Sequence, residues 1–175
     1  MKKLLVVVDM QVDFVDGALG TKEAVAIVPA VKSKIESYMS DVDNQCDIIF
    51  TKDTHGEDYM STQEGENLPV MHCIKGTAGW ELIPELASYV TKYPTIEKPT
   101  FGSMELADII SSGSYDEIEF VGLCTDICVI SNVMLAKAAD VKAKVYVDSN
   151  ACAGVTPESH NNALEAMKMC QVAII

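Results

Sequence analysis

The chain has 175 residues, of which 49% are hydrophobic and 22% are charged, and its formal net charge is −13. This length and composition predict one globular domain spanning residues 1–175 and not a disordered chain. The acidic balance argues against nucleic acid or an anionic membrane as a partner, because both require clustered basic residues. Solubility is the simplest explanation of the acidity.

The amino-terminal segment has no secretory pattern, since Lys2 and Lys3 are followed by only five apolar residues before Asp9. No apolar run approaches the roughly 20 residues that a membrane-spanning helix needs. The six cysteines are scattered, without the spacing of a disulfide framework. These features predict reduced thiols in a cytoplasmic protein.

The first part of the chain alternates between strand and helix patterns. A continuous apolar run over residues 4–8 predicts a strand buried on both faces. Helical spacing of apolar residues predicts a helix over residues 25–39, with its firm part starting near Pro29. Residues 47–51 predict a second strand. The long polar stretch over residues 52–78 is expected to be a loop, and loops of this length usually carry function or are disordered.

The same alternation continues through the middle of the chain. A short helix is expected over residues 80–90 and a short strand over residues 95–98. Ser103 is placed to cap a helix over residues 103–111. Residues 118–123 predict a strand that leads directly into a helix over residues 126–139.

Two strands and a helix complete the pattern. Residues 143–148 predict a strand, and Thr156 followed by Pro157 marks the start of a helix that runs to about residue 170. Residues 172–175 predict a final strand. Repeated strand-then-helix units indicate an α/β fold, in which a parallel sheet is covered by helices on both faces.

The turn over residues 122–128 has the features of a site that presents a nucleophile. Either Thr125 or Asp126 could cap the following helix through a side-chain oxygen. Cys128 would then lie in the first turn, where free N–H groups and the helix dipole favour a thiolate. The alternative is that Cys128 is a small apolar residue packed under the sheet.

Topology would bring Cys128 close to two further groups, because ligands bind beyond the carboxyl ends of parallel strands. Asp9 ends the first strand, and burial there would raise the pKa of its carboxyl and suit it to carry a proton. Lys98 ends a later strand, and its ammonium group could stabilise a thiolate and polarise a substrate. Taken singly, Asp9 could be a turn cap and Lys98 a solvated charge.

The long loop contains a second group of polar residues, Asp53, His55, Glu64 and His72. Two imidazoles and two carboxylates suit a divalent ion such as Zn, Fe or Mn. A chance set of acids in an acidic loop is the alternative. The third histidine, His160, is expected to be a surface or packing residue.

Seven segments of the sequence resemble the isochorismatase-like cysteine hydrolases, and the nicotinamidase/pyrazinamidase branch looks closest. They are DMQVDF (9–14), TKDTH (51–55), LPVMHC (68–73), GTAGWEL (76–82), KPTFGS (98–103), GLCTDICV (122–129) and VTPESH (155–160). The resemblance covers almost the whole chain, and the segments follow the order of the family.

The resemblance implies a three-layer α/β/α fold with a six-stranded parallel sheet. It implies a catalytic triad of Asp9, Lys98 and Cys128, and a cis peptide bond between Leu123 and Cys124. The backbone N–H groups of Cys124 and Cys128 would form an oxyanion hole. The enzyme would hydrolyse a small amide, nicotinamide above all, through a thioester.

For the metal, the resemblance carries over Asp53, His55, Glu64 and His72 as ligands of one divalent ion, Zn in the first place and Fe or Mn otherwise. In the family this ion and its waters hold the ring nitrogen of the substrate, and an aromatic residue at the position of Phe14 contacts the ring. The family also commonly self-associates, so a homo-oligomer is expected.

Two segments depart from the nicotinamidase pattern. Residues 68–71 contain no aromatic residue before His72, and residues 99–103 replace the usual aromatic-Ser-aromatic segment. A related hydrolase that acts on another carbamoyl or ureido compound is therefore an alternative. Two others are a redox or metal-sensing protein that uses Cys124 and Cys128, and a non-catalytic binding module on the same fold.

Overall fold

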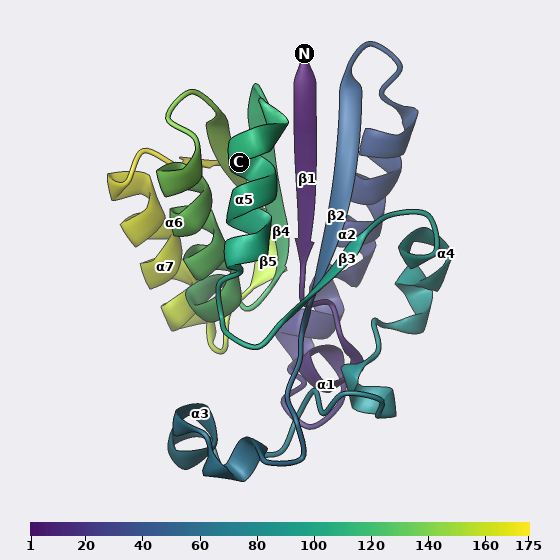
Figure 1. Cartoon of the computed structure of the whole chain (residues 1–175), viewed down its shortest axis with the longest axis vertical. Helices are drawn as coiled ribbons and strands as arrows, with labels where there is room; N and C mark the ends of the chain where they lie inside the picture. Colours follow the sequence, from purple (N-terminus) through teal and green to yellow (C-terminus); the bar gives the residue numbers. More distant parts are fainter.

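A computed structural model describes all residues, 1–175, and has a six-stranded parallel sheet at its centre (Figure 1). The strand order is β3-β2-β1-β4-β5-β6. The strands are β1 (Lys2–Val8), β2 (Gln45–Asp53), β3 (Thr95–Lys98), β4 (Glu117–Leu123), β5 (Lys144–Ala153) and β6 (Ala173–Ile174). The parallel sheet predicted from the sequence is confirmed.

Strand β1 lies in the middle of the sheet, between β2 and β4. Its residues from Leu4 to Val8 are fully buried, which explains their unbroken apolar pattern. From β1 the chain adds β2 and β3 on one side and then returns to add β4, β5 and β6 on the other. The reversal makes the carboxyl ends of β1 and β4 the expected position of a ligand crevice.

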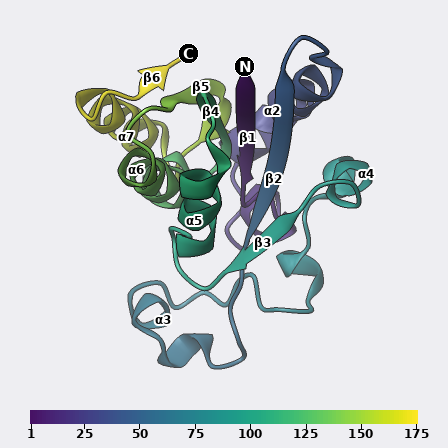
Figure 2. The ribbon, with the colours of Figure 1, turned by 45° about the horizontal axis from the view of Figure 1, so that its top comes forward.

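Helices cover both faces of the sheet (Figure 1, Figure 2). Helices α2 (Lys22–Ser40) and α4 (Ala87–Val90) pack on one face with Val7, Phe50 and neighbouring strand residues. Helices α5 (Met104–Gly113), α6 (Ile130–Ala139) and α7 (Pro157–Met169) pack on the other. None of the helices combines the length and the apolar character needed to span a bilayer.

The short helices α1 (Val12–Val15) and α3 (Gln63–Asn67) lie beyond the carboxyl ends of the strands, at the bottom of Figure 1. The segment predicted as a loop over residues 52–78 contains α3 and the 3₁₀ turn Tyr59–Ser61, and two further 3₁₀ turns, Ala78–Trp80 and Pro84–Leu86, begin at its end and after it. Thr62 caps α3 by accepting a hydrogen bond from the N–H of Gly65 at 3.0 Å. This cap helps to give the segment a defined conformation beyond the edge of the sheet.

The start of α2 was predicted too late. The helix begins at Lys22, where the Thr21 hydroxyl accepts a hydrogen bond from the Ala24 N–H at 3.0 Å. Pro29 therefore lies inside the helix and not near its start. Burial of the apolar face that includes Val31 and Ile35 compensates for the backbone hydrogen bond that a proline cannot donate.

The segment after β4 also differs from the prediction. Residues Thr125–Val129 form a single π-helical turn, and the regular helix α6 starts only at Ile130. Neither Thr125 nor Asp126 caps it, because their side chains bind His160 and the Val155 N–H instead. Strand β5 is longer than predicted and reaches Ala153. The expected helix over residues 80–90 is divided into short turns.

Gly122 is required where β4 passes β1. Its φ is +114°, and a Cβ added there would lie 2.1 Å from the carbonyl oxygen of Val8. Gly76 also has a positive φ, +85°, but a Cβ there would meet no atom within 4 Å. Both glycines therefore adopt a backbone conformation that other residues disfavour, but only Gly122 also has no room for a side chain.

We predict that Gly122→Ala and Gly76→Ala both lose about 1–3 kcal/mol of unfolding free energy from the unfavourable φ. Gly122→Ala should lose clearly more, because the added methyl group overlaps the backbone of β1. Urea unfolding of the two variants and the unchanged chain measures the difference. Equal losses would show that the approach of β4 to β1 is not tight.

Candidate active site

The carboxyl ends of four strands converge on one site. Asp9 directly follows β1, Asp53 ends β2 and Lys98 ends β3. Cys128 lies in the π-helical turn after β4. Parallel strands place these side chains, which are up to 119 positions apart in the chain, at the same edge of the sheet. The structure therefore brings the predicted nucleophile, acid and lysine together.

The ammonium group of Lys98 lies at the centre of this group of side chains. Its Nζ is 2.6 Å from Asp9 Oδ2 and 3.4 Å from both Cys128 Sγ and Asp53 Oδ1. Lys98 is 1% exposed, Asp9 is 0% exposed and Cys128 is 4% exposed. The Thr51 hydroxyl donates to the other oxygen of Asp9 at 2.6 Å. One carboxylate oxygen of Asp9 is therefore paired with the Lys98 ammonium, and the other accepts a hydrogen bond from Thr51.

Burial controls the protonation of these groups. It raises the pKa of the Asp9 carboxyl, although the Lys98 ammonium opposes this. Burial alone would lower the pKa of Lys98, but the charges of Asp9 and Asp53 raise it and keep the ammonium charged. Burial and the Asp9 carboxylate raise the pKa of the Cys128 thiol well above its ordinary value, against the effect of Lys98.

The expectation that Cys128 would be a thiolate through the helix dipole is therefore wrong. The sulfur is buried beside an acid, so the proton stays on it until a base removes it. Asp9 is the acid that contributes to this shift and is also paired with Lys98.

The turn that carries Cys128 begins with the predicted cis peptide bond between Leu123 and Cys124. The Cys124 carbonyl accepts hydrogen bonds from the N–H groups of Ile127 and Val129, both at 3.0 Å. The Cys124 N–H itself makes no hydrogen bond within the protein. Cys124 and Cys128 are free thiols, and burial raises the pKa of Cys124 to about 12, which disfavours a redox role for the pair.

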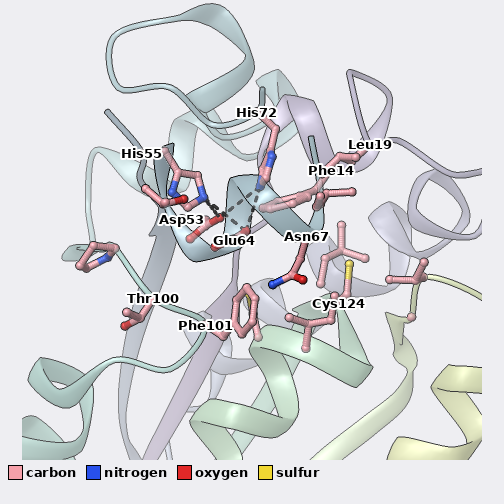
Figure 3. A pocket seen from close by; sticks show the side chains of 18 of the residues that line it. Phe14, Leu19, Asp53, His55, Glu64, Asn67, His72, Thr100, Phe101 and Cys124 are labelled. Atoms are coloured by element: carbon pink, nitrogen blue, oxygen red, sulfur yellow. Dashed lines mark hydrogen bonds and ion pairs between the residues drawn. The ribbon is translucent and has the colours of Figure 1, made fainter. Parts of the chain in front are cut away.

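The four predicted metal ligands also form one group (Figure 3). One possible ligand atom from each of Asp53, His55, Glu64 and His72 lies within 4.8 Å of the others. His55 Nε2 is 2.9 Å from Asp53 Oδ2, and His72 Nε2 is 3.5 Å from Glu64 Oε1. Nitrogen and oxygen donors in this number fit Zn, Fe or Mn.

The electrostatics of the group favour a cation. Burial would lower the pKa of the His72 imidazole, but the nearby carboxylates of Asp53 and Glu64 raise it to about 10. The Nδ1 of His72 hydrogen-bonds the Val70 carbonyl at 2.8 Å, which directs Nε2 toward the carboxylates. A hydrogen bond of this kind on the second ring nitrogen is typical of metal-binding histidines.

Residues that the sequence analysis did not assign hold these ligands in place. The Gln11 side-chain amide donates to the carbonyl of Asp53 at 2.8 Å and accepts from its N–H at 2.7 Å. The Asp13 carboxylate accepts from the Cys73 N–H at 2.8 Å, next to His72. Both residues lie in the DMQVDF segment (9–14), and its position directly after β1 was the only feature of the sequence that could have pointed to them.

A cavity of about 800 Å³ opens beside these groups. Figure 3 shows Phe14, Leu19, Asn67, Phe101 and Cys124 around it together with the metal-ligand group. Cys128 lines the cavity, whereas Asp9 and Lys98 do not. Phe101 lies in the segment 98–103, for which no contact with the substrate was predicted from the sequence, and it places a second aromatic ring beside the cavity.

The cavity has no lysine or arginine in its lining, and its only basic lining residues are His55 and His72. The sequence contains no arginine, and its lysines do not contribute to the wall. Its charged lining residues are Asp53 and Glu64, with the imidazoles of His55 and His72 between them. The cavity is thus apolar apart from the metal-ligand group and a few neutral polar side chains.

Comparison with known proteins identifies the class. The model of the Isochorismatase domain family matches residues 3–175, so the chain belongs to this family and the resemblance found in the motifs is confirmed.

Among curated proteins, the nicotinamidase/pyrazinamidase of Mycobacterium tuberculosis is 26% identical over 187 residues, which cover 99% of this chain and 98% of the relative. A pyrazinamidase of Pyrococcus horikoshii, solved in complex with zinc, has a TM-score of 0.84 at 29% identity, covering 99% of this chain and 98% of that one. The pyrazinamidase/nicotinamidase of Streptococcus mutans has a TM-score of 0.87 at 27% identity and covers 99% of both chains.

The metal-ligand group leads to a direct prediction. Zinc titration, followed by equilibrium dialysis and metal analysis, should find a single tightly bound divalent ion per chain. Glu64→Gln should weaken zinc binding by at least about 10-fold, because loss of a ligand costs no less than loss of a supporting group. Glu66→Gln changes the same charge in the same helix outside this group and serves as the control. Equal zinc affinity in the two variants would contradict the assignment.

Proposed function

We propose that this protein is a metal-containing cysteine amidohydrolase that converts nicotinamide to nicotinate and ammonia. The observation that carries the proposal is the Lys98 ammonium, which contacts Asp9 Oδ2 and Cys128 Sγ at the edge of a cavity that also contains the metal-ligand group. The family membership and the nicotinamidase names of the relatives support the same activity.

Acylation begins at the buried thiol of Cys128. Asp9 accepts the thiol proton, and the resulting thiolate attacks the carbonyl carbon of the amide. Lys98 stabilises the thiolate through its positive charge. The raised pKa of Asp9 suits this step, because a carboxylate with a higher pKa is a stronger base.

The tetrahedral intermediate carries a negative charge on the former carbonyl oxygen. The backbone N–H groups of Cys124 and Cys128 donate to this oxygen, and the unpaired N–H of Cys124 supports the assignment. Asp9 then returns its proton to the leaving nitrogen, the C–N bond breaks, and ammonia leaves a thioester on Cys128. Water, deprotonated by Asp9, attacks the thioester and releases the carboxylic acid and the thiol.

Substrate orientation is assigned to the metal-ligand group. Asp53, His55, Glu64 and His72 would hold a divalent ion, Zn in the first place, and such an ion would bind the ring nitrogen of the substrate. Phe14, whose ring centroid is 5.4 Å from that of His72, would contact the substrate ring. Phe101 is assigned a similar contact from the facing part of the wall.

The cavity wall favours a neutral substrate. A carbamoyl amino acid carries a carboxylate, which would need a basic partner when it leaves water. No lysine or arginine lines the wall, and His55 and His72 are assigned to the metal ion. The volume of about 800 Å³ exceeds the needs of one pyridine ring. A larger neutral amide is therefore the second candidate substrate.

We expect Cys128→Ala and Asp9→Asn each to reduce ammonia release from nicotinamide by roughly 10⁴-fold or more, because both groups act in every bond-breaking step. Cys124→Ala should keep most of the activity, since only its backbone takes part. Turnover is followed with a coupled ammonia assay. Near-normal turnover by Cys128→Ala would rule out the thioester mechanism.

The role of the metal is tested with a pair of substrates. Chelation should reduce hydrolysis of nicotinamide, mainly through a higher KM, and added zinc should restore it. Benzamide has the same shape without the ring nitrogen, so its slower hydrolysis should respond little to chelation. N-carbamoylsarcosine should be a poor substrate, because no lysine or arginine lines the cavity to pair with its carboxylate. Equal sensitivity of benzamide and nicotinamide to chelation would argue against orientation through the ring nitrogen.

A further inference from the structure

His160 contacts the turn that carries the nucleophile. Its Nδ1 lies 2.8 Å from the hydroxyl of Thr125, the first residue of the π-helical turn. Thr125 is 0% exposed, and this is the only hydrogen bond that its hydroxyl makes. Because a buried hydroxyl needs a partner, the imidazole determines how Thr125 is oriented. From the sequence alone, His160 was predicted to be only a surface or packing residue.

The neighbouring backbone is tied to the same turn. The Asp126 carboxylate accepts a hydrogen bond from the Val155 N–H, with both oxygens at 3.2 Å. Gly154 allows the close approach, because a Cβ there would lie 2.9 Å from the Cα of His160. Gly154 and Val155 also line the cavity.

Helix α7 is a rigid base for these contacts. Thr156 and Ser159 form a reciprocal capping box at its start, with Pro157 in the first turn. Such caps suppress fraying of the first turn, in which His160 lies. The imidazole is therefore held from one side by the capped helix and contacts the catalytic turn on the other.

His160 itself is not placed to react with substrate. It is absent from the cavity wall, and its hydrogen bond reaches Thr125 and not Cys128. Burial lowers the pKa of the imidazole, although Asp126 opposes this, so the ring is neutral at neutral pH and keeps an acceptor nitrogen. In either tautomer, Nδ1 can form a hydrogen bond with the hydroxyl of Thr125, because a hydroxyl both donates and accepts.

We propose that His160 is a positioning residue, which holds Thr125 so that the turn over residues 124–128 keeps its backbone N–H groups directed at the carbonyl oxygen of the substrate. The catalytic part of this inference rests on the proposed amidase function. The hydrogen bond crosses from helix α7 to the oxyanion turn, so its loss should affect the transition state more than substrate binding.

The experiment compares His160→Ala with His160→Asn and with Asn161→Ala. The Asn side chain can place an amide oxygen or NH₂ group close to the position of Nδ1, whereas Ala removes the hydrogen-bonding group. Asn161 is the next residue of α7 and is exposed, so its variant controls for changes in the helix itself. Hydrogen–deuterium exchange of the segment 121–133, thermal unfolding, kcat and KM are measured for each.

We expect His160→Ala to increase exchange in the segment 121–133 and to lower kcat by about 10–100-fold, less than the loss of a whole oxyanion donor. KM should change by less than about 2-fold, His160→Asn should recover most of kcat, and Asn161→Ala should match the unchanged chain. Thr125→Val should reproduce the loss, and adding it to His160→Ala should cause little further decrease, because both remove one interaction.

The outcomes separate the positioning role from the amidase proposal. If the unchanged protein hydrolyses no amide but His160→Ala still increases exchange in the turn, the amidase proposal fails and the structural contact stands. If the protein is active and His160→Ala leaves both exchange and kcat unchanged, the positioning role is wrong. A parallel loss of thermal stability and activity that His160→Asn does not restore would reduce His160 to a packing residue.

Discussion

The buried ammonium group of Lys98 is the interaction on which the site depends. A lysine that is 1% exposed is tolerated only because carboxylates compensate for the loss of water, and Asp9 and Asp53 both lie within 3.4 Å of its Nζ. This constraint requires the ends of β1, β2 and β3 to meet at one point. The parallel sheet satisfies it, because all its strands end at the same edge.

Asp53 connects the two halves of the site. Its Oδ1 faces Lys98, and its Oδ2 faces His55 and the rest of the metal-ligand group. The carboxylate is kept ionised because, although burial raises its pKa, the imidazoles and Lys98 hold the pKa below its ordinary value. Gln11 fixes the backbone of the same residue through two hydrogen bonds. One carboxylate thus links the chemistry at Cys128 to the group proposed to orient the substrate.

Much of the fold was predictable from local patterns. The apolar run of β1, the cap at Thr156 and the repeated strand–helix order are properties of short segments, and all are present in the structure. The predictions that were wrong concern places where distant contacts override local preference. Pro29 lies inside α2 because the helix buries its apolar face against the sheet. Thr125 and Asp126, typical capping residues, instead bind groups 35 and 29 positions away.

The sequence by itself determined which residues gather at the proposed site and at which edge of the sheet they lie, since the order of strands and the rule for parallel sheets are enough for that. It also determined the family, through seven motifs between residues 9 and 160, and the family model matches residues 3–175. Only the tertiary structure decided the burial that favours a protonated Cys128, the second aromatic ring at Phe101 and the contact of His160 with the turn that carries Cys128. Burial and long-range hydrogen bonds decide these features, and both depend on segments that are far apart in the chain.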